Sequence, residues 1–173
     1  MGALLFSPSG RIGPADFIRG AIALSVLLFL VKISPLAGIA VSGIVQIVGL
    51  VLIYCWLALF IKRYHDAGKS GWLALIPVAI IVGLGAFFVN GLVTEMVAPE
   101  LLENLQDEMI EATSDGFGSV MQVSQGETAQ ELARTSAFPV ALTRAAMAFS
   151  VAYLTNMMTK SDPGPNQYGP PTI

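Results

Sequence analysis

The fold is decided at residues 62–72, Lys-Arg-Tyr-His-Asp-Ala-Gly-Lys-Ser-Gly-Trp, which separate two long apolar segments. Three of the nine basic residues and the single histidine of the chain fall within this stretch. A short, positively charged turn between apolar segments is held at a membrane surface, and its charge orients the segments on both sides. The stretch therefore predicts the topology, and it is also where polar chemistry is expected.

The composition is that of a membrane protein. Of the 173 residues, 54% are hydrophobic and 12% are charged, and the mean hydropathy is +0.70. A soluble domain carries about 25% charged residues. Crossing the hydrocarbon layer takes roughly 20 apolar residues as helix, because each backbone polar group must be satisfied within the segment. The sequence predicts an all-α, four-helix bundle in one integral membrane domain (1–173), with spans at about 17–34, 38–61, 73–94 and 136–158.

The basic residues indicate the orientation of these spans. Short loops rich in Lys and Arg stay in the cytoplasm. Four spans with both termini inside place three basic groups on that side: Arg11 with Arg19, the 62–72 turn, and Lys160 in the tail at 159–173. We therefore expect an N-in, C-in topology.

The segment 95–135, which this topology places outside, is strongly acidic. Its first nine charged residues are all Asp or Glu. Apolar residues at helical spacing predict an amphipathic helix over 99–112, and we expect the glycine-containing stretch 116–126 to break it. Thr128 and Glu131 fit a capping box that opens a helix running into the fourth span. The acidic segment is interpreted as a solvated surface helix, with a lid or a docking surface for a basic partner as the alternative.

Arg144 is a charge inside the fourth predicted span. Leaving such a charge uncompensated in a bilayer costs about 2.5 kcal/mol or more. We expect it to find an anion, and Glu95 at the outer end of the third span is the predicted partner. A structural pair or a snorkelling side chain is one interpretation, and a role in binding a substrate anion is the other.

The glycines of the 62–72 turn do not form a nucleotide-binding loop. Gly68-Lys69-Ser70 resembles the end of a Walker A motif, but that motif needs glycine where Arg63 stands, and a strand in front of it. A basic turn of this kind can still bind a phosphate group through its backbone and side chains. His65 beside Asp66 also suggests acid–base chemistry, although this signal is weak on its own.

Three motifs together carry a family resemblance. Ser9-Gly10-Arg11-Ile12-Gly13 with Asp16-Phe17, then the stretch 62–72, and then Pro163-Gly164-Pro165-Asn166-Gln167-Tyr168-Gly169-Pro170-Pro171 resemble the three signatures of the DUF805 family. These are small bacterial inner-membrane proteins of unknown function. The resemblance therefore implies a multi-pass protein of the bacterial inner membrane, and it implies no activity.

The predicted topology brings all three motifs to the cytoplasmic surface. The tail is too rich in proline and glycine to be helical. We expect it to fold back, so that Asn166 and Tyr168 pack near His65 and Arg11. The candidate binding residues of this composite site are Arg11, Arg63, His65, Asp66, Lys69, Ser70, Asn166 and Tyr168.

Three classes of function remain open. The first is a membrane-embedded binding or scaffold module that recognises an anionic head group or a protein partner. The second is an oligomeric transporter or channel that uses Arg144, and the third is an enzyme acting on a lipid or phosphorylated substrate with His65 as base. We favour the first, which is not enzymatic.

Expected partners are membrane lipids including anionic phospholipid, a further copy of the chain or another membrane protein, and no nucleic acid. We expect no cofactor and no metal site, and the single cysteine, Cys55, excludes a Cys-based one.

Overall fold

The computed structural model describes residues 5–37, 43–88 and 94–172. All the regular elements in this part of the chain are helices, as expected. They are α2 (Pro14–Lys32), the 3-10 helix η1 (Ser34–Ala37), α3 (Gly43–Asp66), the 3-10 helix η2 (Gly71–Ala74), α4 (Leu75–Leu84), α5 (Thr94–Val97), α6 (Pro99–Asp115), α7 (Phe117–Ser124) and α8 (Glu127–Met158).

Four helical segments are long and apolar enough to cross a membrane, which confirms the expected number. They are Pro14–Lys32, Ile47–Asp66, Gly71–Phe88 and Glu127–Met158. The second helix runs to Asp66 and so includes the first part of the predicted turn. The expected start of the second span (38–42) and end of the third (89–93) lie outside the described residues.

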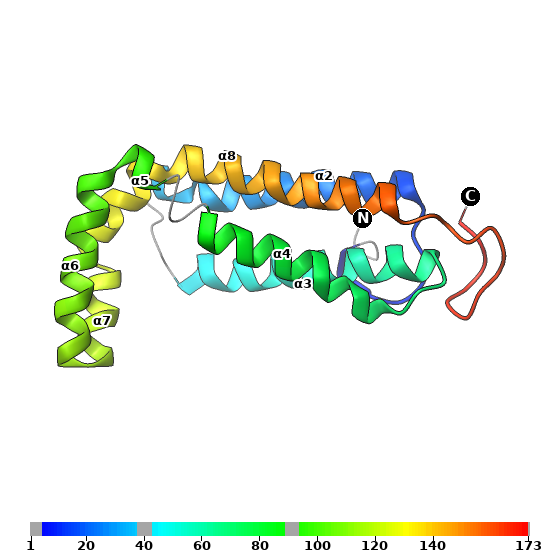
Figure 1. Ribbon diagram of the computed structural model, residues 1–173, viewed down its shortest axis with the longest axis horizontal. Coiled ribbons are helices and arrows are strands. Elements are labelled where there is room, and N and C mark those ends of the chain that lie inside the picture. The colour runs from blue at the N-terminus through cyan, green and yellow to red at the C-terminus, as the bar shows by residue number, and fades with distance from the viewer. Residues whose placement is uncertain (1–4, 38–42, 89–93, 173) are drawn as a thin grey trace.

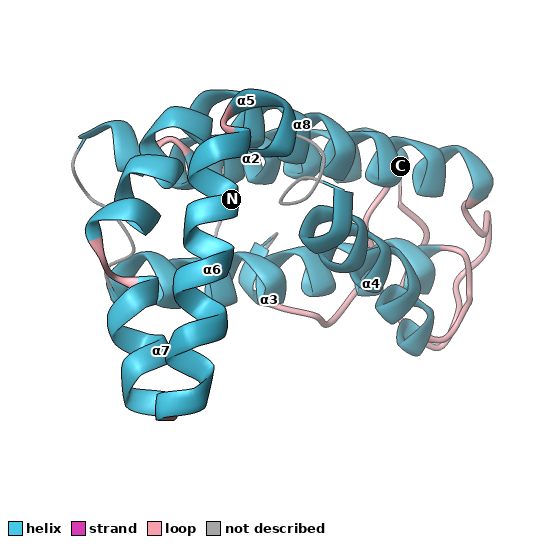
Figure 2. Cartoon of the chain, turned by 60° about the vertical axis from the view of Figure 1, so that its left-hand side comes forward, coloured by secondary structure: helices cyan, strands magenta, loops and turns pink. Residues whose placement is uncertain are grey.

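The four helices α2, α3, α4 and α8 run side by side along the long axis of the molecule (Figure 1). We call them the helical body. The short helices α5, α6 and α7 lie at one end of it, with α6 and α7 forming a hairpin that stands across the axis (Figures 1 and 2). We call these three helices the acidic arm. The C-terminal tail lies at the opposite end, beyond the end of α8.

The core of the helical body lies where α2 begins and where α3 and α8 end. The helices α2 and α8 pack along each other through Ala21, Ala148 and Ala152, which are fully buried. Small side chains let helix backbones approach closely, which favours packing in a bilayer. Phe17 of α2 and Phe60 of α3 add a ring contact with centroids 5.5 Å apart. This end of the body is therefore the better-packed end.

The acidic arm contains the helix and the break that the sequence predicts. The predicted helix 99–112 is present as α6 and extends to Asp115. The expected break is present at Gly116, with φ of 104°, and most of the remaining stretch is helical because α7 follows at once. A glycine in this backbone region turns the chain sharply, and the apolar residues of α7 then form a second helix beside α6.

The predicted capping box at the start of α8 is wrong. Gly126 is the N-cap residue, and no side chain caps this helix. The turn from α7 leaves only two residues before α8, so Thr128 is already inside the helix. Its Oγ1 donates instead to Glu108 Oε1 of α6, at 2.7 Å. The expectation that this helix continues into the fourth span is confirmed, since α8 is unbroken despite Pro139.

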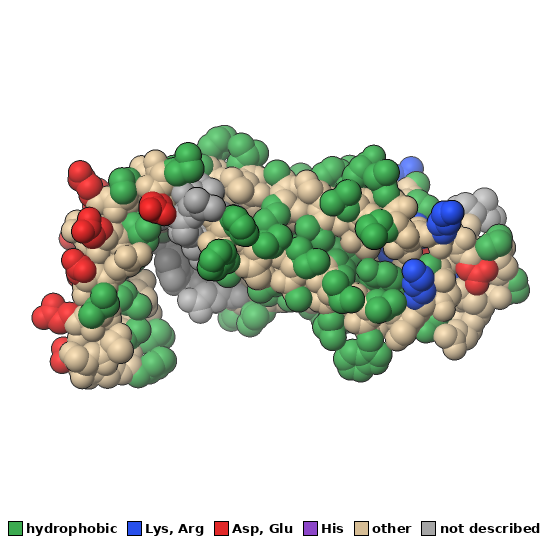
Figure 3. Space-filling view, in the orientation of Figure 1, with side chains coloured by type: hydrophobic (Ala, Val, Ile, Leu, Met, Phe, Trp, Pro, Cys, Tyr) green, Lys and Arg blue, Asp and Glu red, His purple; other side chains and the backbone are tan. Residues whose placement is uncertain are grey.

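Hydrophobic, basic and acidic side chains occupy different parts of the molecular surface. Hydrophobic side chains cover much of the visible face of the helical body, Lys and Arg lie at the end that carries the tail, and Asp and Glu gather over the acidic arm (Figure 3). Leu50, for example, is 68% exposed in the middle of an apolar helix. Apolar side chains exposed along four such helices are typical of lipid-facing surfaces.

Candidate functional site

Three segments that are far apart in the sequence meet at the end of the body opposite the acidic arm. We call this region the junction and define it as residues 10–13, 63–71 and 156–172. The first leads into α2, the second is the end of α3 and the turn into η2, and the third is the end of α8 and the tail. The three family-like motifs of the sequence therefore come together in space.

Asp66 lies at the centre of the junction. Its carboxylate is fully buried and accepts from both neighbouring arginines: Oδ1 from Arg11 Nε at 3.2 Å, and Oδ2 from Arg63 Nη1 at 2.7 Å. Oδ1 also accepts from Thr172 Oγ1 at 2.6 Å. Its backbone carbonyl, at the end of α3, accepts from the backbone N–H of Asp162 at 2.8 Å. One residue thus ties the N-terminal segment, α3 and the tail together.

The side chain of Arg11 donates hydrogen bonds to backbone carbonyls of the tail. Its Nη2 donates to the carbonyl of Asp162 at 2.6 Å, and Nη1 donates to the carbonyls of Gly164 at 2.8 Å and Gly169 at 3.2 Å. Its side chain is only 2% exposed. A planar guanidinium with five donors suits such a cage of carbonyl oxygens. Arg11 therefore organises a tail that has no helix or sheet of its own.

Arg63 makes the corresponding contacts to α8. Its Nε donates to Asn156 Oδ1 at 2.7 Å, its Nη1 donates to Ser161 Oγ at 3.1 Å, and its Nη2 donates to the carbonyl of Thr159. A buried charge is tolerated only when partners replace its hydration. Both arginines meet this condition with protein acceptors. The geometry favours a structural role for Arg11, Arg63 and Asp66 over direct contact with a ligand.

The tail folds back as expected. The rings of His65 and Tyr168 stack with centroids 3.7 Å apart and an interplanar angle of 7°. Asn166 Nδ2 donates to the carbonyl of His65 at 3.1 Å, and the tail closes a tight turn between Asn166 and Gly169. The His65 Nδ1 lies 3.2 Å from the carbonyl oxygen of Gly10, so this nitrogen carries the proton in the bond.

Lys69 and Ser70 lie on the surface of the junction. Gly68 supplies the positive φ of 66° that ends α3, and the backbone N–H of Lys69 then donates to the carbonyl of Tyr64 at 2.9 Å. Ser70 Oγ accepts from the backbone N–H of Trp72 at 3.4 Å and caps η2. Both side chains of the pair Lys69–Ser70 are exposed, so they are available to a partner.

The approach of η2 to α3 leaves no space at Gly71. A Cβ there would lie 2.9 Å from His65 Nε2 and 3.0 Å from Ile61 Cγ2. Glycine is therefore needed for the close contact that sets His65 against the turn.

The sequence did not single out several residues that complete the junction. Ser161, Asp162 and Thr172 look like ordinary polar residues of a loop, and no periodicity marks them. Asn156 carried a weak signal, since an amide near the end of an apolar span usually bonds to a neighbouring element. Each becomes meaningful only because Arg11, Arg63 or Asp66 lies opposite it.

Arg144 lies far from the junction. It is partly buried on α8 and lines a cavity in the other half of the helical body. Glu95, in α5, is exposed and does not line this cavity. The pairing of these two residues stays a prediction. In the part of the chain that the structure describes, no group of three or more His, Cys, Asp or Glu side chains gathers as metal ligands would.

Comparison with known proteins places the chain in a family. The family described as "Protein of unknown function (DUF805)" matches residues 5–170. No match was found among curated proteins or among solved structures. The match covers the motifs that form the junction together with all four candidate spans, and the chain therefore belongs to the DUF805 family.

Proposed function

We propose that this protein is a binding module of the bacterial inner membrane that recognises the anionic head group of a phospholipid at its junction. Four candidate spans support a membrane location. The basic end of the molecule carries the junction, and the acidic arm lies at the other end (Figure 3). Because basic ends stay in the cytoplasm, the junction is proposed to face the cytoplasm and the arm to lie outside.

The observation that carries the proposal is the exposure of Lys69 and Ser70 on a turn that the junction holds in place. Trp72 follows two residues later and is 79% exposed. A tryptophan at the end of an apolar helix prefers the membrane interface. It would hold Lys69 at the depth of the lipid phosphates, where a cationic ammonium and a hydroxyl can both bind an anionic oxygen.

We propose that two of the eight candidate residues contact the ligand. Arg11, Arg63 and Asp66 bond to one another and to the tail, and His65 stacks on Tyr168. In this proposal they keep the turn rigid, so that little conformational freedom is lost on binding. The ligand contacts are assigned to Lys69 and Ser70.

The test is native mass spectrometry of the purified protein with phosphatidylglycerol and, separately, with phosphatidylcholine. We expect retention of phosphatidylglycerol, and the double variant Lys69→Ala with Ser70→Ala should weaken it about fivefold or more, since one basic side chain near an anionic surface contributes about 1 kcal/mol. Arg134→Ala is the matched control, because Arg134 is also exposed but lies at the other end of the body. Equal retention of both lipids, or no effect of the double variant, would reject a head-group site and favour a protein partner.

A further inference from the structure

A large cavity opens between α2, α3, α4 and α8, in the half of the helical body next to the acidic arm. Its volume is about 850 Å³. Most of its wall is aliphatic, with Leu28, Leu52, Ile81 and Met147 among the lining residues. Leu102 and Leu105 of α6 also line it, so the arm forms part of the wall. The cavity is separate from the junction in both position and chemistry.

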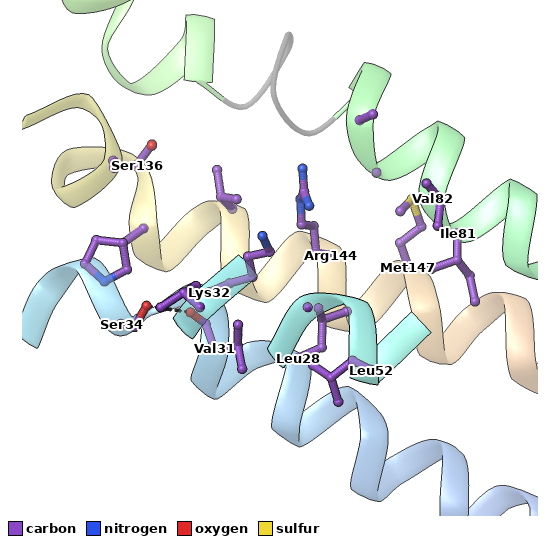
Figure 4. Close-up of a pocket in the computed structure, with 18 of the residues that line it drawn as sticks. Leu28, Val31, Lys32, Ser34, Leu52, Ile81, Val82, Ser136, Arg144 and Met147 are labelled. Carbon is purple, nitrogen blue, oxygen red and sulfur yellow. Dashed lines mark hydrogen bonds between the residues drawn. The ribbon is translucent and has the colours of Figure 1, made fainter. Parts of the chain in front are cut away.

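Two basic side chains enter this apolar space. Lys32 ends α2, and Arg144 belongs to α8. Both side chains line the cavity. Figure 4 shows Arg144 extending from α8 into the cavity, with Lys32 nearby. None of the described residues that line the cavity is Asp or Glu.

This arrangement selects a ligand charge. Two like charges within an apolar space repel each other, and the repulsion is stronger there than in water. An anion between them would turn this repulsion into attraction on both sides. A cationic or zwitterionic ligand would gain much less. Ser34 and Ser136 also line the cavity, but their hydroxyls donate to the carbonyls of Val31 and Leu132, so the two cations carry the charge preference.

The volume selects a ligand size. An apolar protein cavity of about 150 Å³ accommodates benzene, with its six carbon atoms. On that scale, 850 Å³ holds roughly thirty non-hydrogen atoms. This is the size of an amphiphile with one long hydrocarbon chain.

We propose that the cavity binds a single-chain anionic amphiphile. Its carboxylate or phosphate lies at Lys32 and Arg144, and its hydrocarbon chain packs among the aliphatic side chains of the four helices. A free fatty acid and a lysophospholipid share this chemistry. The site is distinct from Lys69 and Ser70, so either proposal can be rejected without affecting the other.

The experiment measures binding of palmitate and of palmitoyl lysophosphatidylglycerol to the purified full-length protein, with hexadecanol and palmitoyl lysophosphatidylcholine as probes that lack the net negative charge. We expect at least one anionic probe to bind about tenfold more tightly than its counterpart. Preference for palmitate identifies a fatty-acid site, and preference for the lysophospholipid identifies a phosphate site. Binding of neither anion, or equal binding of anion and counterpart, would overturn the proposal.

Variants locate the site within the cavity. Arg144→Gln and Lys32→Gln should each weaken the preferred anion about tenfold, since each removes a charged hydrogen-bond donor, and should leave hexadecanol unchanged. Arg134→Gln, on the same helix but outside the cavity wall, is the matched control and should change nothing. Ala133→Phe, which adds a ring to the cavity wall, should weaken charged and uncharged probes alike. Unchanged anion binding in both Gln variants, or in Ala133→Phe, would contradict the assignment.

Discussion

The junction and the acidic arm use charged residues in opposite ways. In the junction, Arg11, Arg63 and Asp66 are buried and bonded to segments far away in sequence. In the arm, the acidic residues are exposed on α5 and α6. Burial decides the difference, because a charge in water interacts weakly with its neighbours whereas a buried one must be matched. Stability should therefore depend on the junction charges and hardly on those of the arm.

The largest effect is expected at Asp66. Replacing it with Asn keeps the shape of the side chain but leaves two buried arginines without their common anion, which should cost about 3 to 5 kcal/mol of unfolding free energy. Denaturant titration of the detergent-solubilised protein measures this. The control is Asp16→Asn, since the Asp16–Arg19 pair is exposed and contributes little. Equal stability of the two variants would remove the contrast between buried and exposed charges.

Arg11→Lys should have the next largest effect. A lysine keeps the charge but cannot reach the carbonyls of Asp162, Gly164 and Gly169 at once, as the guanidinium does. We expect a loss of about 2 kcal/mol, together with release of the tail to proteolysis. Mass spectrometry after brief protease treatment reports the release. A tail that stays protected in Arg11→Lys would show that its other contacts suffice.

Tyr168→Ala tests the ring stack on His65. The stack should contribute about 0.5 to 1.5 kcal/mol to the free energy of unfolding, which Tyr168→Ala should lose and Tyr168→Phe should retain. Denaturant titration of the two variants measures the difference.

A cysteine pair at positions 65 and 168, in a background with Cys55 replaced by Ala, is expected to crosslink in membranes. Crosslinking that needs detergent or denaturant would argue that the tail does not lie against α3 in the bilayer.

The smallest effect is expected in the arm. Thr128→Val removes the bond from Thr128 to Glu108, which joins α8 to α6 at an exposed position. We expect a loss of no more than about 0.5 kcal/mol, because water can replace an exposed partner. A loss comparable to that of Tyr168→Ala would show that the arm is held more firmly than its exposure indicates.

Much of the fold could be predicted because each span is a local property of the sequence. The apolar runs around Leu50 and Ile76 predict helices wherever they pack, since a bilayer allows a segment no other way to satisfy its backbone. The predicted start of α8 was wrong because the same local sequence is compatible with two different helix starts. Thr128 and Glu131 had the spacing of a capping box, but a helix-to-helix turn of two residues placed the start of α8 at Gly126.

The candidate site was predictable in outline but not in its chemistry. The proline- and glycine-rich tail and the two basic motifs before it indicated a composite surface. The sequence did not show which cations would be buried, because Arg63 and Lys69 look equivalent in one turn. Arg63 lies on the last turn of α3 and faces Asn156 at the end of α8 and Thr159 just after it, whereas Lys69 follows Gly68 and is exposed.

The sequence by itself determined the helical spans, their number and the separation of basic from acidic ends, because hydropathy and net charge are sums over neighbouring residues. Only the tertiary structure decided that Asp66 would bind two arginines, that the tail would close over His65, and that Lys32 and Arg144 would line one cavity. These contacts depend on the packing of α2, α3 and α8 against one another, and no spacing along the chain records them.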